Sequence, residues 1–187
     1  MPLLQTKADA SAWGYGFLGA TASTGNFYLI QQISPSGVFT VTFSSIPSTY
    51  KSLQIRFSLS GNNGNFGLQL NGDSSMANYT QHYLTGNETT AAASGYASGN
   101  YGNTRMLNLG TAGITYPTVG IIDIIDYANT SKYKTTKTII GSNANTSFGA
   151  IELDSSLWLS TAAISSFNFM VPSGNAYTGT VSLYGVS

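Results

Sequence analysis

The sequence predicts an all-β protein, a single jelly-roll-like antiparallel β-sandwich preceded by an extended N-terminal arm. Three observations predict it. Apolar and polar residues alternate along most runs from Phe27 onward, as in half-buried strands. Clusters of Ser, Pro, Gly and Asn separate these runs, as in a sandwich or barrel. No stretch repeats apolar residues at the spacing of an amphipathic helix. With 187 residues, the chain suffices for one sandwich over residues 27–187.

The expected strands follow from this alternation. Residues 53–59 carry a polar residue at every second position, and residues 38–43 place Phe39, Val41 and Phe43 on one face. Residues 119–127 carry isoleucines on both faces, which indicates a middle strand covered on each side. Further strands are expected at 27–33, 66–70, 78–84, 104–109, 135–141, 150–153, 157–159, 166–170 and 180–184.

The connections between these strands have recognisable turn chemistry. Asn71 and Gly72 form an Asn-Gly pair, the strongest kind of short hairpin signal. Pro47 fixes its own φ and holds Ile46 in an extended conformation, which ends one strand before the next begins. A short helical turn is expected near residues 74–79. Residues 88–103, rich in Ala, Ser, Gly, Asn and Tyr, are interpreted as a long surface loop.

Composition excludes several classes of function. Only 7% of residues are charged and the formal net charge is +0, with seven scattered Lys and Arg, so a nucleic-acid partner is not expected. No apolar run is long enough to span a membrane. The chain has no cysteine, which fits folding in a reducing cytosol. Residues 1–10 lack the apolar core of a secretion signal, so export by that route is not expected.

Residues 1–26 form a separate segment, the N-terminal arm. Trp13, Tyr15 and Phe17 alternate with glycines, and Leu18 follows. Aromatic anchors on a permissive backbone suit docking into a neighbouring subunit. The alternative interpretation is a loose terminus or a first strand of the sandwich.

The sequence offers little catalytic chemistry. Its one histidine, His82, shares a strand face with Thr80 and Leu84 and is interpreted as a structural residue. Glu152 and Asp154 form the one local carboxylate pair on a shared face, interpreted as a solvated strand end.

Asp123 and Asp126 are three positions apart, so they face opposite sides of a strand. The oxygen-rich stretch at 71–75 lacks the spacing of a calcium loop. No catalytic residue, metal or cofactor is therefore assigned.

Five segments together resemble a family of tailed-phage virion proteins: residues 43–56, 68–73, 122–134, 157–164 and 183–185. The motifs also have local structural explanations. Asp126 and Asn129 can close side-chain turns at a strand end. Trp158, flanked by leucines, can bury one ring face and offer its N–H to a partner.

The resemblance implies a non-enzymatic virion structural protein that is assembled in the bacterial cytoplasm. A capsid decoration or cement protein is favoured, bound to the major capsid protein or another virion protein and to copies of itself as a homo-oligomer, expected to be a trimer. A tail-fibre location is the alternative. Decoration is favoured over it because a fibre normally contains a stalk or a long repeat, and this sequence has neither.

Two other classes of function remain open at this point. One is a carbohydrate-binding module for host-surface glycans, with Tyr96, Tyr101 and Trp158 as candidate contacts, although these rings can equally be core or subunit contacts. The other is a small hydrolase that uses Glu152 and Asp154.

Overall fold

The computed structural model describes residues 27–61, 66–87, 89–96, 117–143, 149–170 and 176–187. The strands in these ranges are β1 (Phe27–Ile33), β2 (Thr40–Phe43), β3 (Ser52–Gly61), β4 (Gly67–Leu70), β5 (Tyr79–Asn87), β6 (Thr90–Tyr96), β7 (Thr118–Ile125), β8 (Lys134–Asn143), β9 (Gly149–Trp158), β10 (Phe167–Met170) and β11 (Tyr177–Val186).

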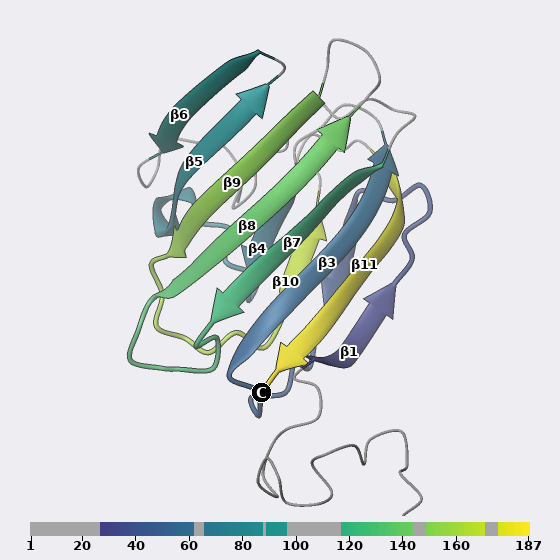
Figure 1. Ribbon diagram of the computed structural model, residues 1–187. Helices are drawn as coiled ribbons and strands as arrows, with labels where there is room; N and C mark the ends of the chain where they lie inside the picture. Colours follow the sequence, from purple (N-terminus) through teal and green to yellow (C-terminus); the bar gives the residue numbers. More distant parts are fainter. Residues whose placement is uncertain (1–26, 62–65, 88, 97–116, 144–148, 171–175) are drawn as a thin grey trace, which may run out of the picture.

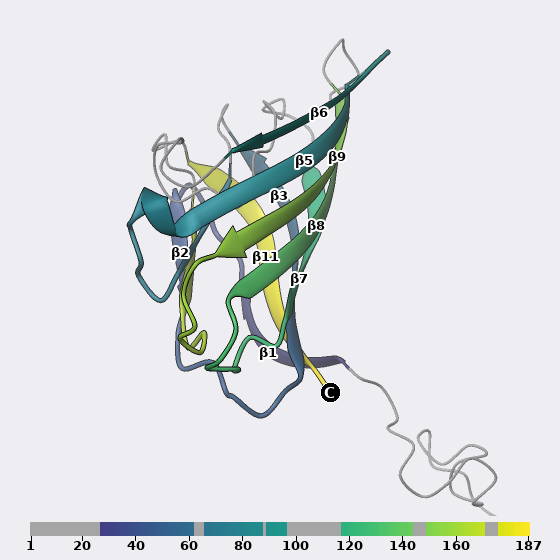
Figure 2. The same cartoon turned by 90° about the vertical axis from the view of Figure 1, so that its left-hand side faces the viewer.

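These strands form two antiparallel sheets, which confirms the all-β sandwich (Figure 1). The large sheet has the order β1-β11-β3-β7-β8-β9-β5-β6, and the small sheet has the order β2-β10-β4. Figure 2 shows β2 on one side of the large sheet. We call this side the inner face of the large sheet. The opposite side, turned toward the viewer in Figure 1, is the outer face.

The core lies between the two sheets. On β3, Leu53, Ile55, Phe57 and Leu59 are all buried, as the alternation predicted. Side chains of β2, β4 and β10 meet them from the small sheet, where strand pairing brings Phe43 and Phe167 opposite each other. Phe57 also approaches the aromatic rings of the small sheet, which gives the core a dense centre.

The turn after β4 connects the two sheets. Asn71 and Gly72 have φ values of 49° and 71°, the left-handed values for which Asn and Gly are suited, so the predicted turn is confirmed. The helical turn expected next is a short 3₁₀ helix, Met76–Asn78. Because β4 belongs to the small sheet and β5 to the large one, this turn carries the chain between sheets.

Two sequence predictions about strand boundaries were wrong. The runs at 150–153 and 157–159 are parts of one strand, β9, because backbone pairing with both β8 and β5 continues through the polar residues between them. Residues 90–96 were expected in a loop but form β6, which pairs with β5 along its whole length. Pairing across strands overrides the weak strand preference of Ala, Ser and Gly here.

Two predictions about burial also need correction. The isoleucine-rich strand β7 does lie in the middle of the large sheet, but only its inner face is covered. Ile122 and Ile124 are buried, whereas Ile121 and Ile125 are exposed. Phe39 is exposed because it lies in a bend before β2 rather than on the strand face with Val41 and Phe43. The strand expected at 104–109 lies outside the described residues.

Candidate binding groove on the outer face

A groove of about 780 Å³ lies on the outer face of the large sheet. Outward side chains of β5, β7, β8 and β9 line it, and so does the turn between β7 and β8. They combine apolar groups with charged ones: His82, Leu84, Asp123, Ile125, Asp126, Lys132, Tyr133, Lys137 and Leu153. Asp123 and Asp126 both line this groove although opposite orientations were predicted, because β7 ends at Ile125 and Asp126 belongs to the turn.

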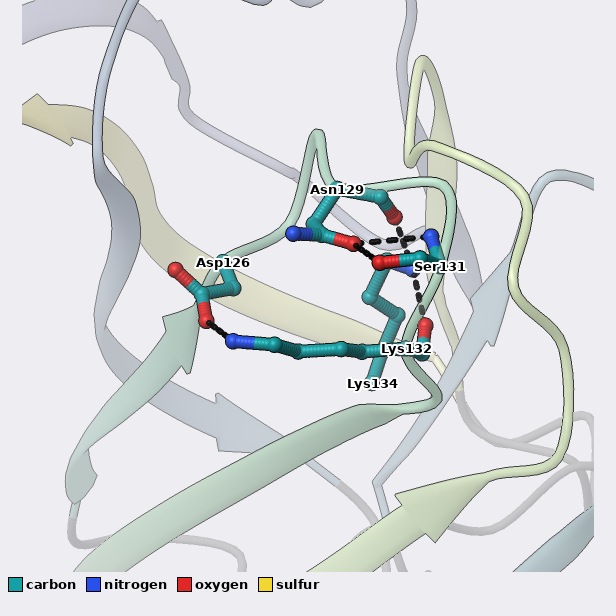
Figure 3. Close-up of polar contacts among 5 residues, drawn as sticks. All are labelled: Asp126, Asn129, Ser131, Lys132 and Lys134. Carbon is teal, nitrogen blue, oxygen red and sulfur yellow. Dashed lines mark hydrogen bonds and ion pairs between the residues drawn. The ribbon is translucent and has the colours of Figure 1, made fainter.

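The turn beside the groove is held by polar contacts, which Figure 3 shows. Lys132 Nζ lies 2.8 Å from Asp126 Oδ2. The side-chain oxygen of Asn129 accepts hydrogen bonds from the backbone N–H and the hydroxyl of Ser131, both at 2.8 Å. The predicted side-chain turn is therefore confirmed at Asn129, while Asp126 forms an ion pair instead. These contacts fix the position of Tyr133, which is 55% exposed beside the groove.

Lys134 anchors the same turn from below. Its side chain is fully buried, and Nζ donates to the backbone carbonyls of Asn129 (2.6 Å), Lys132 (2.7 Å) and Thr161 (3.1 Å). Burial lowers the pKa of Lys134, and the negative charge of Asp126 acts in the opposite direction. Three carbonyl acceptors satisfy the three donors of an ammonium group. Lys134 therefore has a structural role in the segment 122–134.

Charged side chains lie at one end of the groove. Asp123 accepts a hydrogen bond from Gln54 Nε2 at 2.7 Å, and Lys137 Nζ lies 3.5 Å from its other oxygen. His82 faces outward next to Gly95 on β6, where a β-carbon would lie 2.5 Å from His82 Nδ1. This end of the groove can form hydrogen bonds to a neutral polar ligand.

The other end of the outer face is apolar. Ile121, Ile139, Leu153 and Leu84 are direct partners in successive strands, so they form one row across β7, β8, β9 and β5. A second row two residues along contains Val119 and Ile151. All six side chains are exposed, from 42% for Leu153 to 68% for Ile151. We call these six residues the outer apolar patch. Such a contiguous exposed patch is typical of an interaction surface.

The inner face of the same strands is polar and buried. Glu152 and Asp154 are 6% and 1% exposed, so the expectation of a solvated strand end was wrong. They lie in the interior of β9, where Gln81 Nε2 donates to Asp154 Oδ1 at 2.5 Å. Neighbouring hydroxyls at Thr136 and Thr138 are buried without a hydrogen-bond partner. Alternation along β9 was read correctly, but the face that points inward is the polar one.

Burial shifts the titration of this carboxyl pair. It raises the pKa of Glu152 to about 8, and the charge of Asp154 adds to the shift. Burial also raises the pKa of Asp154 to about 6, although hydrogen bonds from Gln81 and Glu152 lower it. At neutral pH the pair therefore holds one proton between its two carboxyl groups. Both groups are buried in the described structure.

The residues proposed for glycan contact do not form one site. Trp158 is 2% exposed and its indole N–H donates to Asp73 at 2.7 Å, so its predicted polar partner exists but its ring packs in the core. Tyr96 is half-buried, and its hydroxyl lies 3.2 Å from that of Tyr83. Tyr101 lies outside the described residues, as do Trp13, Tyr15, Phe17 and Leu18 of the arm.

Sequence reasoning missed Tyr133, Lys134 and the outer apolar patch. The isoleucines at 121 and 139 were visible as strand residues, but the alternation alone did not say which face the small sheet covers. Lys134 gave one local signal, since it directly precedes a predicted strand in the polar stretch after residue 127.

Comparison of the chain with protein-family models, curated proteins and solved structures gives no match. Among the described residues, no group of three or more His, Asp or Glu side chains could hold a metal ion. The described part of the chain also contains no helix of the length and apolar character needed to span a membrane.

Proposed function

We propose that this protein is a non-enzymatic structural component of a tailed-phage virion, a decoration protein that binds the capsid and neighbouring copies of itself. The outer apolar patch is the observation that carries this proposal. Its six side chains lie on a rigid sheet and would gain about 25 cal/mol for each Å² of apolar surface covered by a partner. The sequence also resembles virion proteins, and a virion would contain a partner protein that covers the patch.

The composition supports the same role. Only 7% of the residues in the sequence are charged, so electrostatic repulsion between copies is weak. Association through apolar and hydrogen-bonded contacts should persist near 1 M salt, where the Debye length is about 3 Å. We expect the aromatic residues Trp13, Tyr15 and Phe17 of the N-terminal arm to add apolar contact area.

Mass spectrometry of purified tail-free capsids tests the location of the protein. We expect the chain in these particles at a fixed ratio to the major capsid protein. Its absence from tail-free capsids, together with its presence in whole virions, would overturn decoration in favour of a tail-fibre location.

Ile151→Lys tests the surface. This side chain is exposed, so the variant should fold normally while self-association or capsid binding weakens at least tenfold. Ser48→Lys is the matched control, because it adds the same charge to an exposed position outside the large sheet and away from the patch. Equal binding by the Ile151→Lys variant and the parent would show that the patch is not the contact.

A receptor-binding role is the second candidate, and Tyr133 favours it. An exposed tyrosine beside acidic and amide groups is a suitable platform for a sugar ring. A glycan array with the parent and a Tyr133→Ala variant tests it. Binding lost in the variant would support this candidate, and no binding by the parent at high concentration would exclude it.

A further inference from the structure

The four sheet edges of the described structure differ in how well they are protected against pairing. The edge strands of the small sheet, β2 and β4, have only four residues each. β1 is interrupted by a register shift between Leu29 and Gln31, which disrupts its ladder. In contrast, β6 pairs with β5 in unbroken register over seven residues. It contains no charge and no proline, the usual devices that block an exposed edge.

The outer face of β6 is lined by very small residues. Ala91, Ala93 and Gly95 lie opposite Gly86, Leu84 and His82, so they continue the outer face of β5. Ala91 and Ala93 are exposed. They leave room for large side chains from an additional strand, directly beside Leu84 in the outer apolar patch.

The arm carries the complementary pattern. In an extended segment, Trp13, Tyr15 and Phe17 fall on one face, and Gly14 and Gly16 fall on the other. Paired with β6, this segment would place its three rings beside the alanines of the outer face. Backbone hydrogen bonds would supply affinity, and the fit of large rings to small residues would supply specificity.

The arm of the same copy is too short to pair with its own β6. Phe27 begins β1, at the opposite edge of the large sheet from β6. A strand added to β6 would lie eight strand spacings from β1, about 38 Å at 4.8 Å each. The nine residue steps from Leu18 to Phe27 span at most about 32 Å even when fully extended, before any path around the sheet. The arm must therefore come from a second copy.

We infer that residues 13–18 of one copy add to the β6 edge of a neighbouring copy as a ninth strand of its large sheet. This inference rests on the proposed self-association and names its contact. The arm and the β6 edge are different surfaces, so the interface is head-to-tail. Such an interface forms a closed ring when the rotation between copies closes, and a ring of three copies would match the expected trimer.

Disulfide trapping tests the pairing, and the absence of natural cysteine makes it clean. Tyr15→Cys is combined in turn with cysteine at Ala91, Ala92, Ala93 and Ser94. We expect covalent oligomers under mild oxidation with cysteine at 91 or 93, whose side chains share the outer face, and at least fivefold less with cysteine at 92 or 94. Ser48→Cys, at an exposed position outside the large sheet, is the control partner.

Uniform cross-linking at all four positions, or none at any, would overturn the added strand. A mixture of tagged Tyr15→Cys protein with untagged Ala93→Cys protein must give a mixed covalent dimer if the arm is exchanged between copies. If sedimentation shows an oligomer while no mixed dimer forms, the inference fails and the proposed self-association stands. If sedimentation shows only monomer at micromolar concentration, both fail.

Ala93→Lys provides a second measurement that needs no cysteine. The position is exposed, so the fold should be retained. A lysine on the strand edge should raise the dissociation constant of the oligomer at least tenfold. Ser48→Lys, at an exposed position outside the large sheet, should leave the association unchanged. Association of the Ala93→Lys variant equal to that of the parent would also overturn the inference.

Discussion

The buried carboxyl pair on β9 predicts an unusual pH dependence of stability. Glu152 has an ordinary pKa of 4.5, and burial raises it to about 8 in the folded protein. Because its folded pKa is raised, the group binds more protons in the folded than in the unfolded chain between these values. The contribution of Glu152 to the free energy of unfolding is therefore largest below pH 4.5 and falls as the pH rises to 8.

The size of the effect follows from the same two values. Each unit of pKa difference corresponds to about 1.4 kcal/mol, so Glu152 alone lowers the free energy of unfolding by about 5 kcal/mol between pH 4.5 and 8. Asp154 titrates together with Glu152, so the two pKa shifts do not contribute independently to stability. Glu152→Gln removes the ionisation and keeps a donor for Asp154, so it should stabilise the protein by several kcal/mol at pH 8.

Urea unfolding from pH 5 to pH 8, followed by the fluorescence of buried Trp158, measures the effect. The parent should lose stability with rising pH, and the Glu152→Gln variant should lose much less. Asp73→Asn is the control. Partial burial raises the pKa of Asp73, but hydrogen bonds from Trp158, Asn78 and Ser75 together lower it, so its ionisation affects stability only in acid. Stability that rises between pH 5 and 8, or equal slopes in parent and Glu152→Gln, would refute the reasoning.

Three further substitutions test how the site is supported. Lys134→Met should lower the free energy of unfolding by about 3 kcal/mol, because three carbonyls lose their donor, and chemical denaturation measures it. Trp158→Phe should lower the free energy of unfolding by about 1–3 kcal/mol, because the hydrogen bond to Asp73 is lost. Unfolding monitored by circular dichroism measures this change. Gly120→Ala should lower the free energy of unfolding by about 2 kcal/mol, because the new β-carbon would lie 2.4 Å from the ring of Phe57. In Gly141→Ala the new β-carbon meets nothing within 4 Å, so this control should leave stability unchanged. Thermal unfolding of both variants measures the difference.

Much of the fold could be predicted because alternation identifies strands directly. The run at 53–59 became β3 with its apolar residues buried, and the strand expected at 27–33 matches β1. The Asn71-Gly72 turn was predictable for a local reason, since both residues tolerate positive φ. In each case the information lies within a few neighbouring residues.

The candidate site could not be predicted, because alternation separates two faces without saying which one meets the small sheet. On β9 the apolar residues Ile151 and Leu153 face outward and the acids face inward, the reverse of the usual arrangement. The expectation for Glu152 and Asp154 failed for this reason. The strand β6 was missed because its small residues gain their structure from pairing with β5 rather than from their own preference.

The strand order also constrains how the chain reaches its native state. The last two strands are each inserted into the middle of a sheet: β10 lies between β2 and β4, and β11 lies between β1 and β3. β11, the partner of β1, and β10, the partner of β2, are therefore synthesised more than a hundred residues later. Such long-range pairing gives a high contact order and slow folding. Unpaired strand edges therefore remain exposed until residues 167–186 leave the ribosome, and recombinant yield should improve at low expression rates.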